Sequence, residues 1–182
     1  NPANLRSIAV IGALATDGQS ALGSWRAQGK AEEVVTILQG IMAAAPKSVK
    51  VLSAPGADPR TNDLSGIAAA VEIAKAADVT LLVIGEDFDL SGEARSRSDL
   101  EMPASQLELA RRVLATGKPV VVVLANGRPL ALSWLAGNAP VILESWMPGV
   151  EGGNAVADIL FGKYSPAGRL PARSARAMAL KP

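Results

Sequence analysis

Uninterrupted apolar runs recur along the chain and predict buried β-strands. The runs are rich in Val, Ile, Leu and Ala, and they cover residues 7–12, 49–54, 79–84, 119–125 and 141–146. They lack the apolar/polar alternation that marks a sheet with one face in water. We therefore expect these strands to lie in a mainly parallel sheet that is covered on both faces.

Stretches with helical spacing of apolar residues separate these runs. In residues 32–45, for example, Val34, Ile37, Leu38 and Ile41 fall on one face of a helix. The predicted helices are residues 32–45, 64–77, 103–115, 130–135 and 150–161, while residues 12–29 and 55–63 are predicted to be loops. The alternation predicts the α/β class, as a three-layer sandwich with a mainly parallel sheet of about five or six strands between helices.

The composition fits one domain with a core of aliphatic side chains. Of the 182 residues, 49% are hydrophobic but only 3% are aromatic. No internal repeat or low-complexity linker divides the chain, and no run of about 18 apolar residues predicts a membrane-spanning helix. The net charge is +1 with acids and bases interspersed, so the charge pattern favours neither nucleic acid nor a membrane surface as a partner.

The absence of histidine and cysteine restricts the chemistry. Ser-His and Cys-His nucleophilic sites are excluded, as are metal sites built on histidine or thiolate ligands. Disulfides are excluded too, and cysteine usage therefore does not indicate the redox compartment. Acid–base chemistry must use Asp, Glu, Lys, Tyr or Arg, and we expect no cofactor.

The segment after the third predicted strand has the highest density of charge. Residues 86–101 contain six carboxylates and two arginines. Loops at the carboxyl ends of strands bind ligands in α/β sheets, although a solvated loop can be charged without any such role. Asp87, Asp89, Ser91 and Gly92 match the first half of a calcium loop. The position of the bidentate glutamate holds Ser98, which disfavours calcium.

Three other segments have a structural and a functional interpretation. The glycines of residues 149–154 favour a tight turn before a helix, because the segment lacks a complete phosphate-binding motif. Asn126 to Pro129 has the composition of a turn, although Arg128 could orient a carboxylate of the charged loop. Trp25 lies in a polar, glycine-rich loop, where a core position and a sugar-stacking platform are equally compatible with the sequence.

Glu93 is the remaining candidate among the acids of this loop. Small residues flank it, so it can project from a tight turn. Neighbouring acids would raise its pKa, whereas Arg95 and Arg97 would lower it. A group that protonates a leaving oxygen needs a raised pKa. Residue types alone leave this balance open. Trp134 and Trp146 lie within predicted apolar elements, and we expect them to pack in the interior.

The order of short motifs along the chain resembles a known domain. These motifs include Leu22-Gly23-Ser24-Trp25, Ser91-Gly92-Glu93-Ala94, Asn126-Gly127-Arg128-Pro129, Glu151-Gly152-Gly153-Asn154 and Gly168-Arg169-Leu170-Pro171. In order and spacing they resemble the second, C-terminal α/β-sandwich domain of family three glycoside hydrolases, in the bacterial periplasmic β-glucosidase branch. The resemblance runs from about residue 6 to 171.

This resemblance implies a retaining β-glucosidase mechanism. Glu93 matches the general acid/base and Trp25 the tryptophan that lines the aglycone side. Arg97 and Asp99 match residues that brace the loop, and Arg97 is also a candidate for substrate binding. The nucleophilic aspartate of such enzymes belongs to an N-terminal (β/α)8 barrel, which these 182 residues do not contain. That barrel, as a domain or a separate chain, and a β-glucoside or oligosaccharide are the implied partners.

The ends of the chain depart from the family pattern. We expect residues 1–171 to form the family domain and residues 172–182 to be a disordered tail of another origin. The start at Asn1-Pro2, without Met or a leader, suggests an excised piece. The resemblance favours a periplasmic or secreted location.

Two other functions remain compatible with the sequence. One is a stand-alone sugar-binding or interaction module, and the other is an unrelated hydrolase activity, for example on activated esters. A surface left without its barrel would also allow the chain to form a homo-oligomer.

Overall fold

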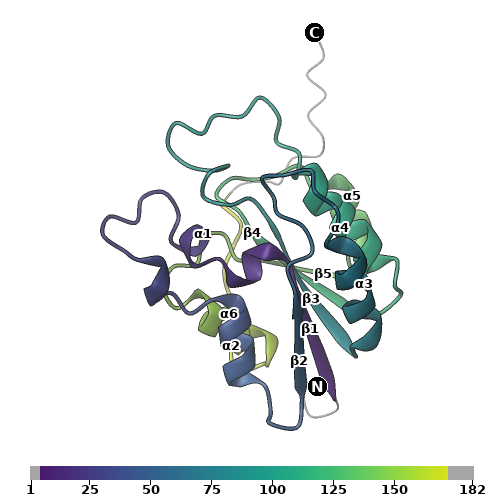
Figure 1. Ribbon diagram of the computed structural model, residues 1–182. Coiled ribbons are helices and arrows are strands. Elements are labelled where there is room, and N and C mark those ends of the chain that lie inside the picture. The colour runs from purple at the N-terminus through teal and green to yellow at the C-terminus, as the bar shows by residue number, and fades with distance from the viewer. Residues whose placement is uncertain (1–4, 172–182) are drawn as a thin grey trace.

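A five-stranded parallel sheet forms the middle layer of the molecule (Figure 1). The computed structural model describes residues 5–171. The strands are β1 (Ser7–Ile11), β2 (Lys50–Ala54), β3 (Val79–Gly85), β4 (Val120–Ala125) and β5 (Val141–Glu144). Their order is β2-β1-β3-β4-β5, and every neighbouring pair is parallel. The predicted fold class is confirmed. The predicted tail at residues 172–182 lies outside the described residues, so the domain boundary stays a prediction.

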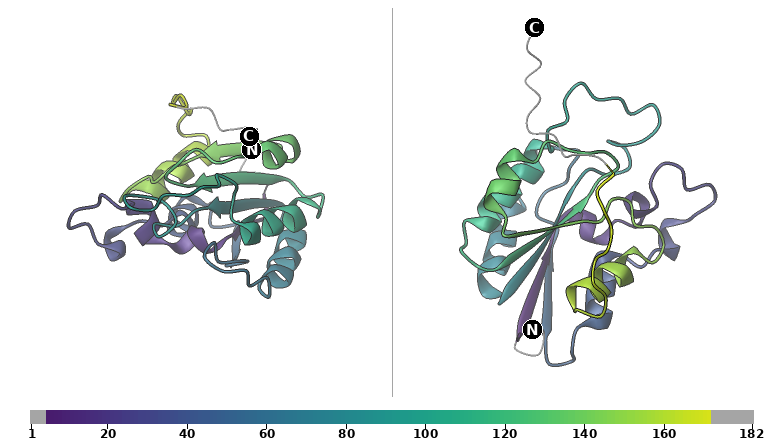
Figure 2. Two further views of the ribbon diagram at one scale, coloured as in Figure 1. Left: turned by 90° about the horizontal axis from the view of Figure 1, so that it is seen from above. Right: turned by 180° about the vertical axis from the view of Figure 1, so that it is seen from behind.

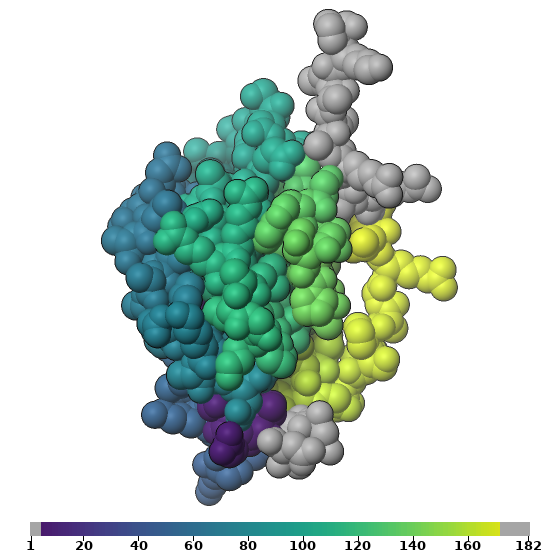
Figure 3. Space-filling view, turned by 90° about the vertical axis from the view of Figure 1, so that its right-hand side faces the viewer, coloured from purple at the N-terminus to yellow at the C-terminus, as the bar shows by residue number. Residues whose placement is uncertain are grey.

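Helices cover both faces of the sheet, which explains why the strand sequences are apolar without alternation. On one face lie α3 (Ile67–Ala76), α4 (Ala104–Leu114) and α5 (Ser133–Asn138), and on the other α2 (Ile37–Ala44) and α6 (Gly152–Leu160) (Figure 2). Within β1, Ile11 belongs to the first core and Val10 to the second. Figure 3 shows α3, α4 and α5 side by side over their face. None of the helices within residues 5–171 has the length and apolarity that a bilayer crossing requires.

The predicted helix at residues 32–45 is wrong in its first turn. A short 3-10 helix, η3 (Ala31–Glu33), is followed by extended backbone, and α2 begins only at Ile37. Thr36 ends the extended segment with a capping box: its hydroxyl accepts from the Gln39 N–H at 3.3 Å, and Gln39 Oε1 accepts from the Thr36 N–H at 2.8 Å. Val34 is buried as predicted, but it reaches the core from outside the helix.

Two further predictions of secondary structure are corrected. The segment 12–29 is not all loop, because it contains the 3-10 helix η2 (Ala13–Thr16) and the helix α1 (Gly18–Leu22), with Asp17 capping α1 by accepting from the Ser20 N–H at 3.0 Å. The helix predicted at residues 130–135 starts three residues later. Its first residues pair with the charged loop instead, since the Ala131 N–H donates to the Leu100 carbonyl at 2.8 Å.

At one point, the backbones of helices α2 and α6 are in direct contact, with no side chain between them. A side-chain carbon on Gly40 would overlap the Gly153 carbonyl, and one on Gly153 would overlap the Thr36 carbonyl. Backbone hydrogen bonds continue this contact, because Gly153 N–H donates to Val35 O at 2.9 Å. Glycine in residues 149–154 therefore serves close helix packing as well as the predicted turn.

The two remaining tryptophans have different environments. Trp134 packs against the core on the α4 side, and the Arg111 guanidinium lies 5.2 Å from its ring centre. Trp146 lies beyond β5, which ends at Glu144, so the prediction that it sits in the strand is wrong. It has a positive φ of 52° and is half-buried in the loop at the carboxyl end of the sheet.

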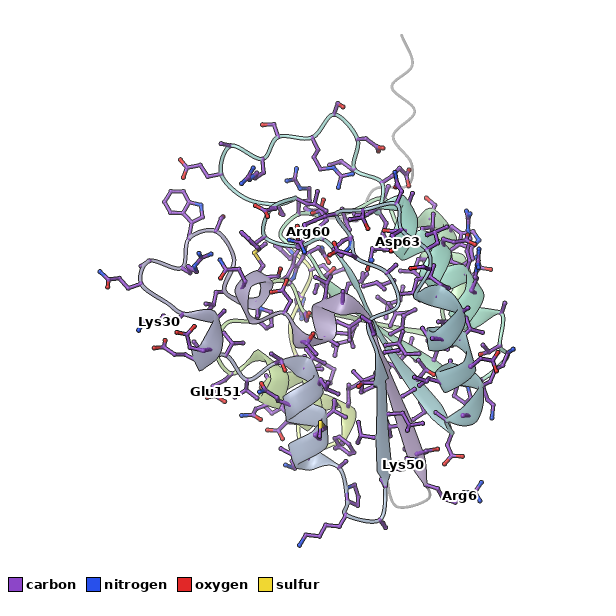
Figure 4. All side chains as sticks on the ribbon, viewed as in Figure 1. Arg6, Lys30, Lys50, Arg60, Asp63 and Glu151 are labelled. Atoms are coloured by element: carbon purple, nitrogen blue, oxygen red, sulfur yellow. The ribbon has the colours of Figure 1, made fainter. Side chains whose placement is uncertain are left out.

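The loops that leave the carboxyl ends of the strands gather at one end of the molecule. Two of them, the β1–α2 segment and the β3–α4 loop, project farthest (Figure 1). Arg60 and Asp63 lie at the same end, whereas Arg6 and Lys50 mark the opposite end, where β1 and β2 begin (Figure 4). Ligand sites of parallel sheets lie at the carboxyl end.

Candidate functional site

Glu93 lies at the tip of a tight turn in the β3–α4 loop. The Arg95 N–H donates to the Gly92 carbonyl at 3.2 Å, which closes a turn with Glu93 and Ala94 at its centre. Gly92 has a φ of 142° and Ala94 a φ of 58°. Alanine seldom adopts a positive φ, and such strain is concentrated at functional sites. The turn therefore directs Glu93 outward at some conformational cost.

The structure brings Glu93 and Trp25 to the same hollow. Its volume is about 500 Å³, and Ser91, Arg128 and Met147 are among the other residues that line it. Trp25 comes from the loop between α1 and η3 and is 80% exposed, so the alternative of a core position for Trp25 is wrong. An exposed indole beside an exposed carboxylate has the composition of a polar ligand site with an aromatic platform.

A direct contact between two loops fixes this arrangement. Gly92 packs so closely on Ser24 that a side-chain carbon on the glycine would overlap the serine side chain. Ser24 precedes Trp25, and Gly92 precedes Glu93. The two candidate residues are thus neighbours because their loops touch, although 68 positions separate them in the sequence.

The arginines of the loop are occupied elsewhere than at Glu93. Arg95 pairs with Asp89 at 3.1 Å, and Arg97 pairs with Glu86. Among the described residues, none forms a hydrogen bond or an ion pair with the Glu93 side chain. The sequence left open whether these arginines act on Glu93, and the structure gives each of them another carboxylate.

Arg97 does not line the hollow that holds Glu93 and Trp25. Its guanidinium contacts Glu86 Oε1 and donates to the Glu101 carbonyl at 3.1 Å, and its side chain faces a second hollow of about 490 Å³ beside Arg60. Asp99 accepts from the Glu101 N–H at 2.8 Å. Both residues stabilise the loop from within, as expected of braces. Arg97 is not among the residues that line the Glu93 hollow, so its predicted role in substrate binding stays a prediction.

Glu86 is the residue of this region that the sequence did not single out. It follows β3 directly, its side chain is 0% exposed, and Arg128 Nε lies 3.3 Å from Oε2 on the side opposite Arg97. Burial raises the pKa of Glu86, while the hydrogen bond from Arg97 and the charge of Arg128 act in the opposite direction. A carboxylate next to an uninterrupted buried strand was the available signal, since such a position is enclosed by neighbouring loops.

Asp87 is also committed to the structure of the loop. Its Oδ1 accepts from the backbone N–H groups of Asp89 and Leu90 at 3.1 and 3.0 Å, and Arg60 Nε lies 3.1 Å from Oδ2. Burial raises the pKa of Asp87, against these hydrogen bonds and the charge of Arg60. Within residues 5–171, no group of three or more acidic side chains is arranged to hold a metal ion.

The hollow offers one proton-transferring group. In the part of the chain that the structure describes, Glu93 is the one acidic residue among those that line it. A single carboxylate can donate or accept a proton at a ligand atom, but it cannot also act as the nucleophile of the same step.

Comparison with known proteins shows the family of the chain. Residues 2–181 match the glycosyl hydrolase family 3 C-terminal domain. The chain belongs to this family. It is 44% identical to the periplasmic beta-glucosidase of Salmonella typhimurium over 186 residues, which cover 91% of this chain and 24% of that protein. It is 36% identical to a beta-xylosidase of Formosa agariphila, again over 91% of this chain and 24% of the relative.

A solved structure shows the same fold. The beta-glucosidase from Listeria innocua in complex with gluconolactone superposes with a TM-score of 0.83 at 32% identity, over 94% of this chain and 23% of that protein. The family resemblance of the motifs is confirmed. The chain spans about a quarter of the length of these relatives.

Proposed function

We propose that this chain is the acid/base-bearing domain of a retaining β-glycosidase. The observation that carries the proposal is the placement of Glu93, which is exposed, has no partner among residues 5–171, and lines one hollow with an exposed Trp25. The membership of the glycosyl hydrolase family 3 C-terminal domains supports it.

In the proposed mechanism Glu93 acts twice. It first donates its proton to the glycosidic oxygen while an aspartate of a (β/α)8 barrel attacks the anomeric carbon. It then takes a proton from the water that releases the sugar, and so regains its starting state. Retaining chemistry requires the two carboxyl groups to be about 5–5.5 Å apart. The barrel must therefore approach the end of the sheet where Glu93 projects.

Trp25 is proposed to contact the leaving group. Sugar rings stack on indole faces, and the exposed ring borders the same hollow as the proton donor. Of the two roles predicted for Arg97, bracing has the better support, because its guanidinium is held by Glu86 and the Glu101 carbonyl.

The substrate and the location follow from the relatives only as proposals. The Salmonella relative is named a periplasmic beta-glucosidase, and the Formosa relative a beta-xylosidase. We propose a terminal β-glucoside as substrate and a periplasmic or secreted enzyme. Activity on an aryl β-xyloside above that on the glucoside would redirect the substrate proposal without affecting the role of Glu93.

The test requires a barrel domain that provides the proposed nucleophile. The chain replaces the equivalent domain of the Listeria innocua beta-glucosidase, and the chimera is compared with its Glu93→Gln variant. For an aryl β-glucoside with a poor leaving group we expect kcat to fall roughly 10²–10⁴-fold. A dinitrophenyl glucoside, whose leaving group needs no proton, should lose far less in the glycosylation step.

Glu101→Gln is the matched control, since it changes an exposed carboxylate of the same loop. It should leave both rates nearly unchanged. Equal rates for Glu93→Gln and the parent chimera on the poor leaving group would rule out the proposed role.

The exposed Trp25 also supports a second candidate, a sugar-binding module without turnover. Calorimetry of the isolated chain with glucose and cellobiose separates the two. Heat of binding that disappears in Trp25→Ala, together with an inactive chimera, would favour the module. The absence of heat with both sugars would count against it.

A further inference from the structure

Arg128 reaches from the loop after β4 to the backbone on both sides of Glu93. Its Nη2 donates to the Leu90 carbonyl at 2.7 Å and to the Arg95 carbonyl at 2.6 Å. These carbonyls belong to the two ends of residues 90–95, here named the Glu93 turn. One guanidinium nitrogen therefore holds the ends of the turn together. Hydrogen bonds from a charged donor are shorter and stronger than neutral ones.

The guanidinium is itself anchored to the sheet. Arg128 Nε lies 3.3 Å from Glu86 Oε2, and the Arg128 side chain is 18% exposed while that of Glu86 is fully buried. Glu86 follows β3, and its N–H donates to the Ala125 carbonyl of β4 at 2.9 Å. The backbone of Arg128 is fixed as well, because its carbonyl accepts from Asn126 Nδ2 at 2.8 Å. The contact with Glu86 is an ion pair without a hydrogen bond, so Arg128 is held at this end by charge attraction and by its fixed backbone.

The other contacts of the Glu93 turn with the rest of the domain include a surface ion pair and the packing of Gly92 on Ser24 and of Ser91 on Gly127. Residues 92–96 are exposed, and the Arg95–Asp89 ion pair lies at the surface, where such pairs contribute little. Ser91 is buried and packs closely on Gly127. A side-chain carbon on Gly127 would overlap the Ser91 hydroxyl. Gly127 is the residue before Arg128, so this packing and the arginine act from the same loop.

We infer that Arg128 is the positioning residue of the proposed acid/base, and that it sets where the Glu93 carboxyl stands relative to a bound glycoside. This inference rests on the proposed function. General acid catalysis requires the proton donor within hydrogen-bond reach of the leaving oxygen. A displacement of about 1 Å can cost roughly a hundredfold in rate. Arg128 does not need to touch the substrate to have this effect.

The first test uses the isolated chain and needs no catalysis. Amide hydrogen exchange followed by mass spectrometry compares the parent with Arg128→Ala. We expect exchange in peptides covering the Glu93 turn to become at least about tenfold faster, with β3 and β4 unchanged, because only local opening is affected. Arg112→Ala, which removes an exposed arginine on α4, is the control and should leave the turn unchanged. Unchanged exchange of the turn in Arg128→Ala would overturn the inference.

The second test measures the consequence for the reaction in the Listeria chimera. Arg128→Ala should lower kcat for a poor leaving group roughly 10–100-fold, while KM changes less than about threefold. The loss of kcat/KM, which reports the glycosylation step, should be smaller for a dinitrophenyl glucoside, as for Glu93→Gln. A merely structural defect would lower kcat/KM equally for both glucosides, and that result would overturn the inference.

The two tests separate failure of the inference from failure of the proposed function. One outcome is that Glu93→Gln leaves the reaction rates unchanged while Arg128→Ala speeds exchange of the turn. That outcome would reject the proposed role of Glu93 but would still support the role of Arg128 in holding the Glu93 turn. Should Arg128→Ala fail to fold, Arg128→Lys replaces it. A lysine cannot reach Glu86 and both carbonyls with one planar group, so it should show the same changes at smaller amplitude. Parent-like exchange and rates in Arg128→Lys would then overturn the inference.

Discussion

At the scale of single residues, the acids of the β3–α4 loop differ in burial although they follow one another closely. Glu86 and Asp87 are buried and paired with arginines, whereas Glu93 is exposed and forms no ion pair within residues 5–171. The first two therefore stabilise the loop, and the third is available to a ligand. Glu86 and Asp87 directly follow β3, whereas Glu93 lies at the centre of the turn formed by residues 92–95.

Glu86→Gln should destabilise the fold strongly. The substitution keeps the shape of the side chain but leaves Arg97 and Arg128 close together without a compensating charge. Removal of one member of a buried ion pair costs about 3–5 kcal/mol, and urea unfolding of parent and variant measures the difference. Glu101→Gln in the same loop should stay within about 0.5 kcal/mol. A loss of unfolding free energy below about 0.5 kcal/mol for Glu86→Gln would contradict the bracing role of Glu86.

The sequence predicted the outward residues of the site better than its buried ones. Motif order led to the prediction of Glu93 and Trp25, and both are exposed and line one hollow. The buried role of Glu86 was missed, and the hold of Arg128 on the turn was only suggested. The contacts that Arg128 makes with Arg95, Leu90 and Glu86 join residues 33 or more positions apart. Spacing along one segment carries no information on which arginine meets which carboxylate.

At the scale of elements, burial on both faces made the strands easy to predict, while helix starts depended on caps. Val34 continues the helical periodicity of α2, yet Thr36 and Gln39 begin the helix after it. A local side-chain hydrogen bond outweighs the pattern of apolar residues, since the orphan N–H groups at a helix start must be satisfied. A cap also explains why α1 was not predicted. Asp17 starts this helix in a glycine-rich segment whose composition indicates a loop.

Gly153→Ala should destabilise the pairing of α2 with α6. The added carbon would overlap the Thr36 carbonyl, so the two helices must separate, and overpacking of this kind costs about 1–3 kcal/mol. Thermal unfolding measures the change. Gly137→Ala in α5 is the matched control, because no atom lies within 4 Å of the added carbon and alanine favours a helix by up to about 1 kcal/mol. Similar stability changes for both substitutions would contradict the close contact.

At the scale of the whole molecule, the two ends of the sheet have different roles. The carboxyl end carries the proposed site, and the amino end holds the central strands together. There Asp78 accepts from the N–H groups of Arg6 and Ser7 at 2.7 and 3.0 Å, and its own N–H donates to the Ser7 hydroxyl at 3.1 Å. These bonds join the start of β1 to the start of β3, far from Glu93.

Asp78→Asn should make stability less dependent on pH in acid. The backbone N–H of Arg6, followed by that of Ser7, holds the pKa of Asp78 below its usual range, against the effect of burial. Because the folded pKa is the lower one, the stabilisation is complete above the unfolded pKa of about 3.9 and is lost as the pH falls through the folded value. Tm measured from pH 7 to pH 2 should show the parent advantage shrinking below about pH 4. An advantage of the same size at pH 7 and pH 2 would refute this assignment.

The contact between Gly92 and Ser24 has a consequence for exchanging parts among relatives. The aromatic wall of the hollow and the proposed proton donor come from different loops, which contact each other at Ser24 and Gly92. A graft of residues 12–36 alone, or of residues 86–101 alone, from another family member would change one side of this contact. We therefore expect both segments to be needed together to keep Trp25 and Glu93 in the same arrangement.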